Sequence, residues 1–393
     1  MKQGILTINA GSSSIKFALF SLAHPISPEA EVSGQIDGIG TNATKLIAKN
    51  RAGERIADQL IAGDAVSHTQ ALDAMLQWFL ATYTGWQIVS VGHRVVHGGD
   101  RYSAPIVVDA TVLGHLESFI PLAPLHEPHN VAGIKALQAL LPDVPQVACF
   151  DTAFHRSQPE VAQLFALPRA LTAEGIKRYG FHGLSYEFIA RALPQHSHRA
   201  DGRVVVAHLG NGASMAAMVN RKCVATTLGF STIDGLMMGT RCGNLDPGLV
   251  LHLMETKGLT VKDMSRILYK ESGLLGVSGI SQDMRTLLSS NKPEAREAVD
   301  LFCYRIVREL GSLVAAAGGI DALVFTGGIG EHAAEVRRRV CLQAEWLGIR
   351  VNPEANARHD VVISAGNSSV DVLVIPTNEE WMMAHHAQTL LAL

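Results

Sequence analysis

The stretch ILTINAGSSSIKFALF at residues 5–20 is an apolar run, a turn of small polar residues and a second apolar run. Apolar runs rich in β-branched and aromatic residues on both sides of an Asn, Gly and Ser turn are typical of a β-hairpin. We expect strands at residues 4–8 and 15–20, joined by the turn at 9–14. Backbone N–H groups of such a turn can bind an anion.

Residues 204–219 repeat this plan about half a chain later, with strands expected at 204–207 and 215–219 around a turn at 209–214. Two copies of one pattern suggest duplicated domains that each offer N–H groups to a shared ligand. A length of 393 residues also exceeds what one hydrophobic core usually serves. We therefore expect two domains, with the chain crossing between them after the strand at 144–150.

Strands and helices alternate along the rest of the chain, which predicts an α/β fold. The further strands are expected at 88–96, 144–150, 322–326 and 370–375. Helical periodicity covers 69–81, 131–141, 293–317 and 331–347.

The composition predicts a folded, soluble cytoplasmic protein, and its size permits an enzyme. Charged residues make up 18% and apolar residues 47%, and the net charge of -3 comes from interspersed signs. This pattern lacks the clustered positive charge that binding to nucleic acid or to an anionic membrane requires. The five cysteines show no metal or redox spacing, and no segment reads as a signal peptide or a membrane span. We expect neither a nucleic acid nor a membrane partner.

A glycine-rich segment at residues 323–331 runs from a strand into a helix, where nucleotides commonly bind. A tight turn needs glycines in any case, and the spacing fits neither the Walker loop nor the dinucleotide fingerprint. Together with the turns at 9–14 and 208–214, however, this segment could enclose ATP.

Two arginines, Arg94 and Arg241, stand next to glycines. A single arginine is more often a solvated surface residue. A guanidinium can nevertheless bind a carboxylate or phosphate through two hydrogen bonds, and glycine neighbours leave room for the ligand.

Two histidines and a carboxylate outside the glycine-rich segments could also carry chemistry. His126 and His129 could bind zinc, but Pro128 disfavours the helix that would align them and no cysteine is near. Asp151 directly follows a strand, where a carboxylate either meets a ligand or caps the next segment.

Near the C-terminus, Thr377 and Glu380 have the spacing of a capping box, which leaves Glu379 unexplained. Its carboxylate could bind Mg²⁺ directly or through water.

The chain resembles the acetate and propionate kinase family, and the resemblance spans nearly the whole chain. The motifs that carry it are 9–16, 93–99, 122–126, 150–155, 179–183, 208–212, 238–241, 327–331 and 376–380. It implies two RNase-H-like domains of the actin, Hsp70 and sugar-kinase type around an ATP cleft, and a homodimer. The first domain would comprise residues 1–150 with a returning helix at 381–393, and the nucleotide-binding domain residues 151–380.

The resemblance also implies site residues. The metal, Mg²⁺ or alternatively Mn²⁺, would be organised by Asn9 and Glu379. The phosphates and adenosine of ATP or ADP would be bound by Lys16, His208, Leu209, Gly210, Asn211, Gly212, Asp283, Met284, Arg285, Gly327, Gly328, Ile329, Gly330 and Glu331. The acyl group would be bound by Arg94, Val96, Leu125 and Phe181. Asp151, His126, His182 and Arg241 would complete the catalytic set, with Arg94.

The implied reaction is direct in-line transfer of phosphate from ATP to acetate, or to another short carboxylate. A carboxylate is already anionic at neutral pH, so the reaction needs cations rather than a general base. Propionate kinase is the nearest alternative. A sugar kinase would instead use Asp151 as a base for a hydroxyl, and an ATPase of the actin or Hsp70 type would not require Arg94, His126 and His182.

The sequence departs from the family pattern at several positions. The segment Leu184-Ser185-Tyr186 stands where Thr-Ser-His is usual, His332 replaces Asn, and Glu127 stands where Asn is common. Thr232 replaces a proline that normally walls the acyl pocket, so the preferred substrate chain length stays open.

Overall fold

A computed structural model describes residues 1–393, and the chain divides into two compact units. Unit 1 comprises Met1–Ala153 and Asn378–Leu393, and unit 2 comprises Phe154–Thr377. These crossings differ by three residues from the boundaries drawn from the sequence at 150/151 and 380/381. Asp151 and Glu379 therefore belong to unit 1, whereas the sequence boundaries placed them in the second domain.

Unit 1 is built on an eight-stranded sheet in the order β5-β4-β3-β2-β1-β6-β8-β7. The strands are β1 Lys2–Ala10, β2 Ser14–Ser21, β3 Val32–Asp37, β4 Lys45–Asn50, β5 Arg55–Leu60, β6 Trp86–Val95, β7 Ile106–Val107 and β8 Gln146–Phe150. The helices are α1 His68–Thr82, α2 Ala110–Ser118, α3 Glu127–Leu140 and α15 Glu379–Leu391, with a 3₁₀ turn at Ile120–Leu122. The predicted opening hairpin is β1 and β2, which pair antiparallel from Gly4 and Ser21 to Ala10 and Ile15.

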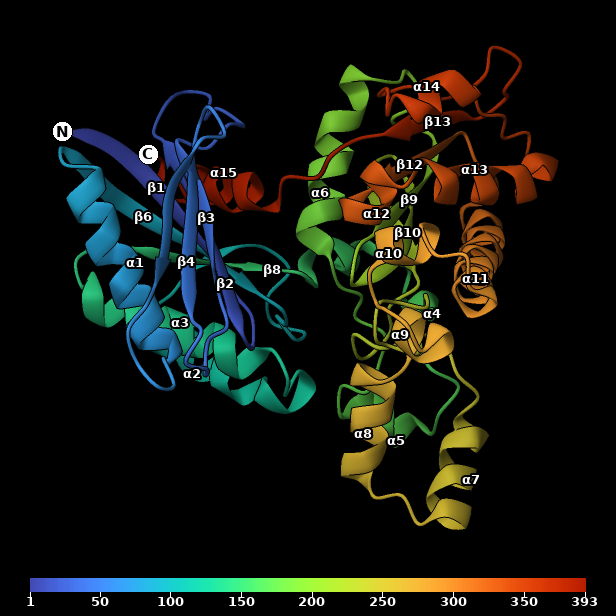
Figure 1. The fold of residues 1–393 in the computed structure, drawn as a ribbon, viewed down its shortest axis with the longest axis horizontal. Coiled ribbons are helices and arrows are strands. Elements are labelled where there is room, and N and C mark those ends of the chain that lie inside the picture. The colour runs from blue at the N-terminus through green and yellow to red at the C-terminus, as the bar shows by residue number, and fades with distance from the viewer. The chain divides into compact units, whose positions relative to one another are not determined.

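The helices of unit 1 cover both faces of its sheet. Helices α1 and α3 pack together against one face (Figure 1), where Val91 of β6 shares a core with Leu72 and Leu137. Neighbouring residues of a strand point to opposite faces, so Gly92 faces the other way, toward α15. A side chain at Gly92 would meet the backbone of Met383 at 3.1 Å. The glycine thus permits α15 to pack closely on β6.

Unit 2 has a five-stranded sheet in the order β11-β10-β9-β12-β13. Its strands are β9 Arg203–Leu209, β10 Ala213–Val219, β11 Lys222–Thr226, β12 Ala322–Thr326 and β13 Asp371–Val374. Its helices are α4 Glu160–Gln163, α5 Arg169–Ala173, α6 Gly183–Ala192, α7 Pro247–Lys257, α8 Val261–Lys270, α9 Gly273–Ser278, α10 Met284–Leu288, α11 Pro293–Ala317, α12 Gly327–His332, α13 Ala334–Gln343 and α14 Pro353–Ala357. Further 3₁₀ turns lie at Ala153–Ser157, Leu193–Gln195 and Glu345–Leu347.

The two sheets share one plan. In each sheet the first three strands pair antiparallel in chain order. On the other side of the first strand lie two further strands, which are parallel to it. The order β3-β2-β1-β6-β8 in unit 1 therefore matches β11-β10-β9-β12-β13 in unit 2. The repeat seen in the sequence is a repeat of the fold, and the α/β class is confirmed.

One predicted helix, at 331–347, is wrong. The structure divides this segment into the end of α12, helix α13 and a 3₁₀ turn, with Ala333 outside helical backbone geometry at φ -98° and ψ 79°. The buried Arg337 side chain donates to the carbonyl oxygens of Gly330 and Glu331 at 2.7 and 2.8 Å. It thereby satisfies the last turn of α12 and allows that helix to end. No helix of the chain is both long and apolar enough to cross a membrane.

Candidate active site

Arg94, at the end of β6, is held by a carboxylate that follows the neighbouring strand β8. Its Nε and Nη2 atoms donate to both oxygens of Asp151, with a shortest distance of 2.6 Å, and Nη1 lies 3.4 Å from Glu379 at the start of α15. Burial alone would lower the pKa of Arg94, but these carboxylates outweigh it and raise the pKa. A permanent cation is therefore fixed beside two anions.

This arrangement bears on the role of Asp151. Its side chain is only 2% exposed, and both oxygens accept from the guanidinium. A carboxylate used in this way is a poor base because taking up a proton would break a charge-assisted pair. The geometry of Asp151 suits an organiser of Arg94.

The first turn of α3 fixes the backbone that follows Arg94. Asn130 accepts from the Val96 N–H at 3.0 Å and donates to the Ala10 carbonyl at 2.9 Å. Glu127 accepts from the His97 N–H at 3.2 Å. Val96, predicted to line the acyl pocket, is thus tied to the end of β1. Sequence reasoning missed that Asn130 links β1 to the backbone after β6, because the sequence does not show which asparagine side chain faces a strand.

His126 immediately precedes α3, and its side chain does not cap that helix. Leu125 is 38% exposed. Pro128 lies within the first turn of α3, where a missing N–H is tolerated. His129, the second residue of the zinc alternative, stacks on His68 with ring centroids 4.9 Å apart.

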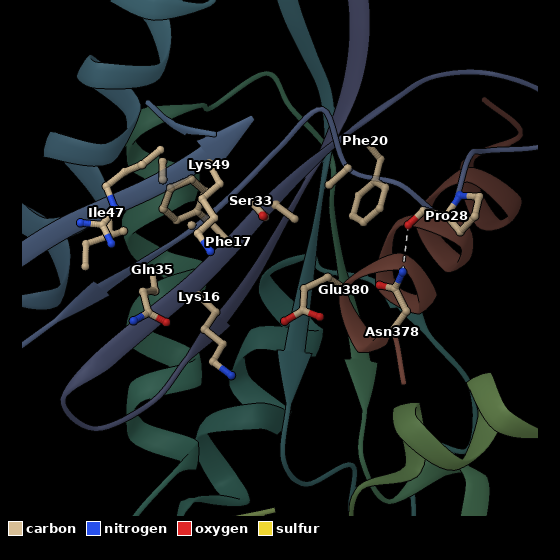
Figure 2. Close-up of a pocket in the computed structure, with 15 residues that line it drawn as sticks. Lys16, Phe17, Phe20, Pro28, Ser33, Gln35, Ile47, Lys49, Asn378 and Glu380 are labelled. Atoms are coloured by element: carbon tan, nitrogen blue, oxygen red, sulfur yellow. Dashed lines mark hydrogen bonds between the residues drawn. The ribbon is translucent and has the colours of Figure 1, made fainter. Parts of the chain in front are cut away.

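Asn9 is the penultimate residue of β1 and pairs with Lys16 of β2 across the hairpin. Lys16 lines a pocket of about 620 Å³ on the sheet of unit 1, together with Gln35, Lys49 and Glu380. Figure 2 shows Lys16 on the strand and Glu380 on α15 as members of this lining. Burial and the neighbouring Glu379 raise the pKa of Glu380, and Lys16 partly opposes this shift.

The capping box expected from Thr377 and Glu380 is wrong. Asn378 is the N-cap of α15 and accepts from the Trp381 N–H at 2.9 Å, while its side-chain amide donates to the Pro28 carbonyl (Figure 2). Glu379 therefore occupies the first turn of the helix, beside Arg94.

In unit 2, His182 and His208 stack with ring centroids 4.5 Å apart. His182 adopts a left-handed backbone conformation, with φ 59°, directly before α6. Such a conformation is costly for a non-glycine residue and is found at functional sites. The rings bond to Ser214 and Ser185, which the sequence did not single out. Phe181, the neighbour of His182, is fully buried.

Arg241 lies against the turn that follows β9. Its Nη1 donates to the Thr232 carbonyl at 3.0 Å and lies 3.9 Å from the position that a Cβ of Gly212 would take. The Gly239 N–H donates to the Asn211 carbonyl at 3.0 Å, and a Cβ at Gly239 would meet the Asn211 side chain at 2.0 Å. A side chain at position 239 would therefore force the Asn211 side chain to move.

A pocket of about 430 Å³ in unit 2 brings together residues from three predicted nucleotide segments. It is lined by Gly210, Asn211, Gln282, Asp283, Met284, Arg285, Leu288, Gly328, Ile329, His332 and Ala333. Asp283 and Arg285 pair at its edge at 2.6 Å, and this pairing lowers the pKa of Asp283 to about 2. The sequence did not single out Gln282 and Leu288 for this site.

The remaining residues of the predicted nucleotide set support this pocket without lining it. Glu331 accepts from the Gly327 N–H at 2.9 Å and so closes the start of α12. Gly327, at φ 75°, packs on the Leu209 backbone, where a Cβ would come within 2.9 Å. His208, Gly212 and Gly330 likewise lie outside the lining residues.

Unit 1 holds a partly buried arginine with carboxylate partners. Unit 2 holds a stacked histidine pair, an arginine and a pocket of about 430 Å³. These cations and this pocket suit a phosphotransferase whose acceptor is a carboxyl group. Comparison with known proteins agrees. The chain belongs to the acetokinase family, whose model matches residues 4–385. The family membership inferred from the sequence is confirmed.

Relatives cover the full length of the chain. It is 54% identical over 392 residues to an acetate kinase of Rhodopseudomonas palustris, with 98% of each chain covered. A solved propionate kinase from Francisella tularensis is 35% identical, with a TM-score of 0.91 and coverage of 98% of this chain and 99% of that one. A solved acetate kinase from Porphyromonas gingivalis is 36% identical, with a TM-score of 0.88 and coverage of 99% and 100%.

Proposed function

We propose that the chain catalyses the reversible, Mg²⁺-dependent transfer of the γ-phosphoryl group of ATP to acetate, giving acetyl phosphate and ADP. The observation that carries this proposal is the partly buried Arg94 held by the buried Asp151 and followed by Val96. A fixed guanidinium next to an apolar side chain suits a short carboxylate better than a hydroxyl substrate.

The residues of each unit supply different parts of the reaction. In unit 1, Arg94 would bind and orient the acetate carboxylate, and Asp151 would hold the guanidinium in place. In unit 2, Arg241 and His182 would stabilise the charge on the transferred phosphoryl group, and the pocket at Gly210 and Ile329 would bind the adenosine. Two anions 4 Å apart repel each other by about 4 kcal/mol at an effective dielectric of 20, which explains why the proposed set is cationic.

Two residues of unit 1 would hold a divalent metal. Asn9 and Glu379 offer an amide oxygen and a carboxylate, which are ligands that Mg²⁺ or Mn²⁺ accepts alongside water. When bound, the metal would neutralise phosphate charge. Unit 1 also offers Lys16 as a cation for the phosphates. We further propose a cytoplasmic homodimer, as the resemblance to the family implies.

Replacing Arg94 with alanine tests the proposal. A charged anchor contributes about 1.5–3 kcal/mol, so kcat/KM for acetate should fall roughly 10- to 150-fold. The matched control is Arg51→Ala, which removes an exposed arginine of the same unit. A loss of less than tenfold for Arg94→Ala would refute the assignment of the acetate anchor.

A second measurement separates the reaction classes. ATP consumption should be stimulated by acetate and not by a polyol. Stimulation by a polyol would instead indicate a sugar kinase, and ATP hydrolysis that no small carboxylate stimulates would indicate an ATPase of the actin or Hsp70 type. The solved Francisella relative makes propionate the first alternative substrate to compare.

A further inference from the structure

The two stacked histidines of unit 2 share a hydrogen-bonding feature. Nδ1 of His182 lies 2.8 Å from Oγ of Ser214, and Nδ1 of His208 lies 2.8 Å from Oγ of Ser185. Both serine side chains are fully buried. Each imidazole is therefore fixed through Nδ1, and its Nε2 atom remains on the opposite edge of the ring.

These contacts are extended by a residue that departs from the family pattern. Tyr186, also fully buried, places its hydroxyl 2.5 Å from Oγ of Ser214. Tyr186 and Ser185 lie in the first turn of α6, and Ser214 lies opposite His208 in the pairing of β10 with β9. One helical turn and one strand pair thus position all three hydroxyls.

The direction of the hydrogen bonds follows from the proton inventory. Oγ of Ser214 bonds to Tyr186 and His182 alone, and it carries one proton. The phenol is the more acidic hydroxyl and hence the better donor. Tyr186 then donates to Ser214, and Ser214 donates to Nδ1 of His182. Nδ1 becomes an acceptor, so the proton of the neutral ring lies on Nε2.

The Nε2 atoms point toward the turn at residues 209–212. Nε2 of His182 lies 3.4 Å from the position of a Cβ on Gly212, and Nε2 of His208 lies 3.9 Å from that on Gly210. Arg241 is next to the same turn. A neutral Nε2–H can donate to an anion at this turn. The stacked rings then add no positive charge to that of Arg241.

We propose that Tyr186 and Ser214 are positioning residues that hold His182 as a neutral Nε2–H tautomer aimed at the 209–212 turn, stacked on His208, whose Nδ1 lies against Ser185. The inference rests on the proposed function only in taking a phosphoryl group as the acceptor. Tyr186 suits this role because a phenol, unlike the histidine usual at this position, does not take up a proton near neutral pH.

Nitrogen NMR of the intact protein tests the tautomers without any activity measurement. The full chain is labelled with [¹⁵N]histidine, and the His182 signals are identified by their loss in His182→Gln. We expect Nε2 of His182 to be protonated and Nδ1 to be bare at neutral pH. Protonation at Nδ1 with a bare Nε2, which corresponds to the reverse hydrogen-bond direction, would overturn the proposal.

Two variants test the contribution of the hydroxyls. Tyr186→Phe should shift His182 to a mixture of tautomers, and Ser214→Ala should do so more strongly. Both should lower kcat about two- to tenfold, the worth of one hydrogen bond, with KM for acetate and ATP unchanged. Tyr304→Phe, in an exposed part of α11, is the matched control.

The outcomes separate this inference from the proposed function. If Tyr186→Phe leaves both the tautomer and kcat unchanged, the positioning role is refuted while acetate phosphorylation stands. If the tautomers are as expected but the wild-type chain does not phosphorylate acetate, the proposed function fails and the hydrogen-bond assignment stands.

Discussion

Replacing Glu127 with glutamine should remove a large pH dependence of stability. The Glu127 side chain is fully buried, and only one of its carboxyl oxygens, Oε2, has a hydrogen-bond partner. Burial raises its pKa from 4.5 to about 8, the His97 N–H opposes the shift, and the charge of Asp151 adds to it. The folded protein thus holds the carboxyl group in its neutral form at neutral pH.

The sign and size of the effect follow from proton linkage. Between pH 4.5 and about 8 the folded state binds one proton more than the unfolded chain at this group. Its contribution to stability is therefore complete at low pH and is lost as the pH rises, at about 1.4 kcal/mol per pH unit. From pH 5.5 to 7.5 the wild type should lose about 2.7 kcal/mol that Glu127→Gln retains.

Urea unfolding followed by tryptophan fluorescence measures this difference. Three of the four tryptophans lie in unit 1, so exchanging the exposed Trp346 for phenylalanine makes the signal report on unit 1. Glu127→Gln is made in that background, with Glu54→Gln as the control for removing an exposed carboxylate. A stability difference between Glu127→Gln and its parent that stays constant from pH 5.5 to 7.5 would refute the buried neutral acid.

Three further predictions concern unit 2. Gly327→Ala should destabilise the fold by about 1–3 kcal/mol in thermal unfolding, because φ is 75° and the Leu209 backbone lies within 2.9 Å of the new Cβ. The control Gly328→Ala meets no atom within 4 Å and should cost less than about 1 kcal/mol. Equal losses of stability in the two variants would contradict this prediction. Thr232→Pro keeps the carbonyl that binds Arg241, so activity with acetate should stay within about threefold of the wild type. The kcat/KM for propionate should fall relative to that for acetate. An unchanged ratio of the two kcat/KM values would show that this position does not wall the acyl pocket. The four buried cysteines of the whole chain should resist alkylation at pH 7.5 until urea unfolds the protein, and rapid labelling of the native form would contradict their burial.

Much of the fold could be read from local sequence patterns. The strand expected at 322–326 and the helix at 293–317 match β12 and α11 at both ends, and both hairpins form where small polar turns interrupt apolar runs. These signals depend on neighbouring residues alone. The helix expected at 331–347 failed because Arg337 reaches back to carbonyl oxygens of α12, a tertiary contact that periodicity does not encode.

The candidate site was less accessible to sequence reasoning. Arginines next to glycines pointed to Arg94 and Arg241, but their structural partners Asp151 and the Thr232 carbonyl lie 57 and 9 residues away along the chain. Nothing in the sequence marked Ser214 as the partner of His182, because serine is common in turns, where its hydroxyl can bond to the nearby backbone. The partner of a polar group depends on strand register and helix phase, which single residues do not reveal.

The return of the chain at Asn378 makes unit 1 discontinuous, and this has a consequence for biosynthesis. Residues 154–377 are translated before α15, which packs on β1 and β6 and carries Glu379 to Arg94. The first 153 residues are therefore synthesised well before the helix that covers one face of their sheet. Chains terminated before Asn378 lack the helix that covers this face, so they should be inactive and prone to aggregation.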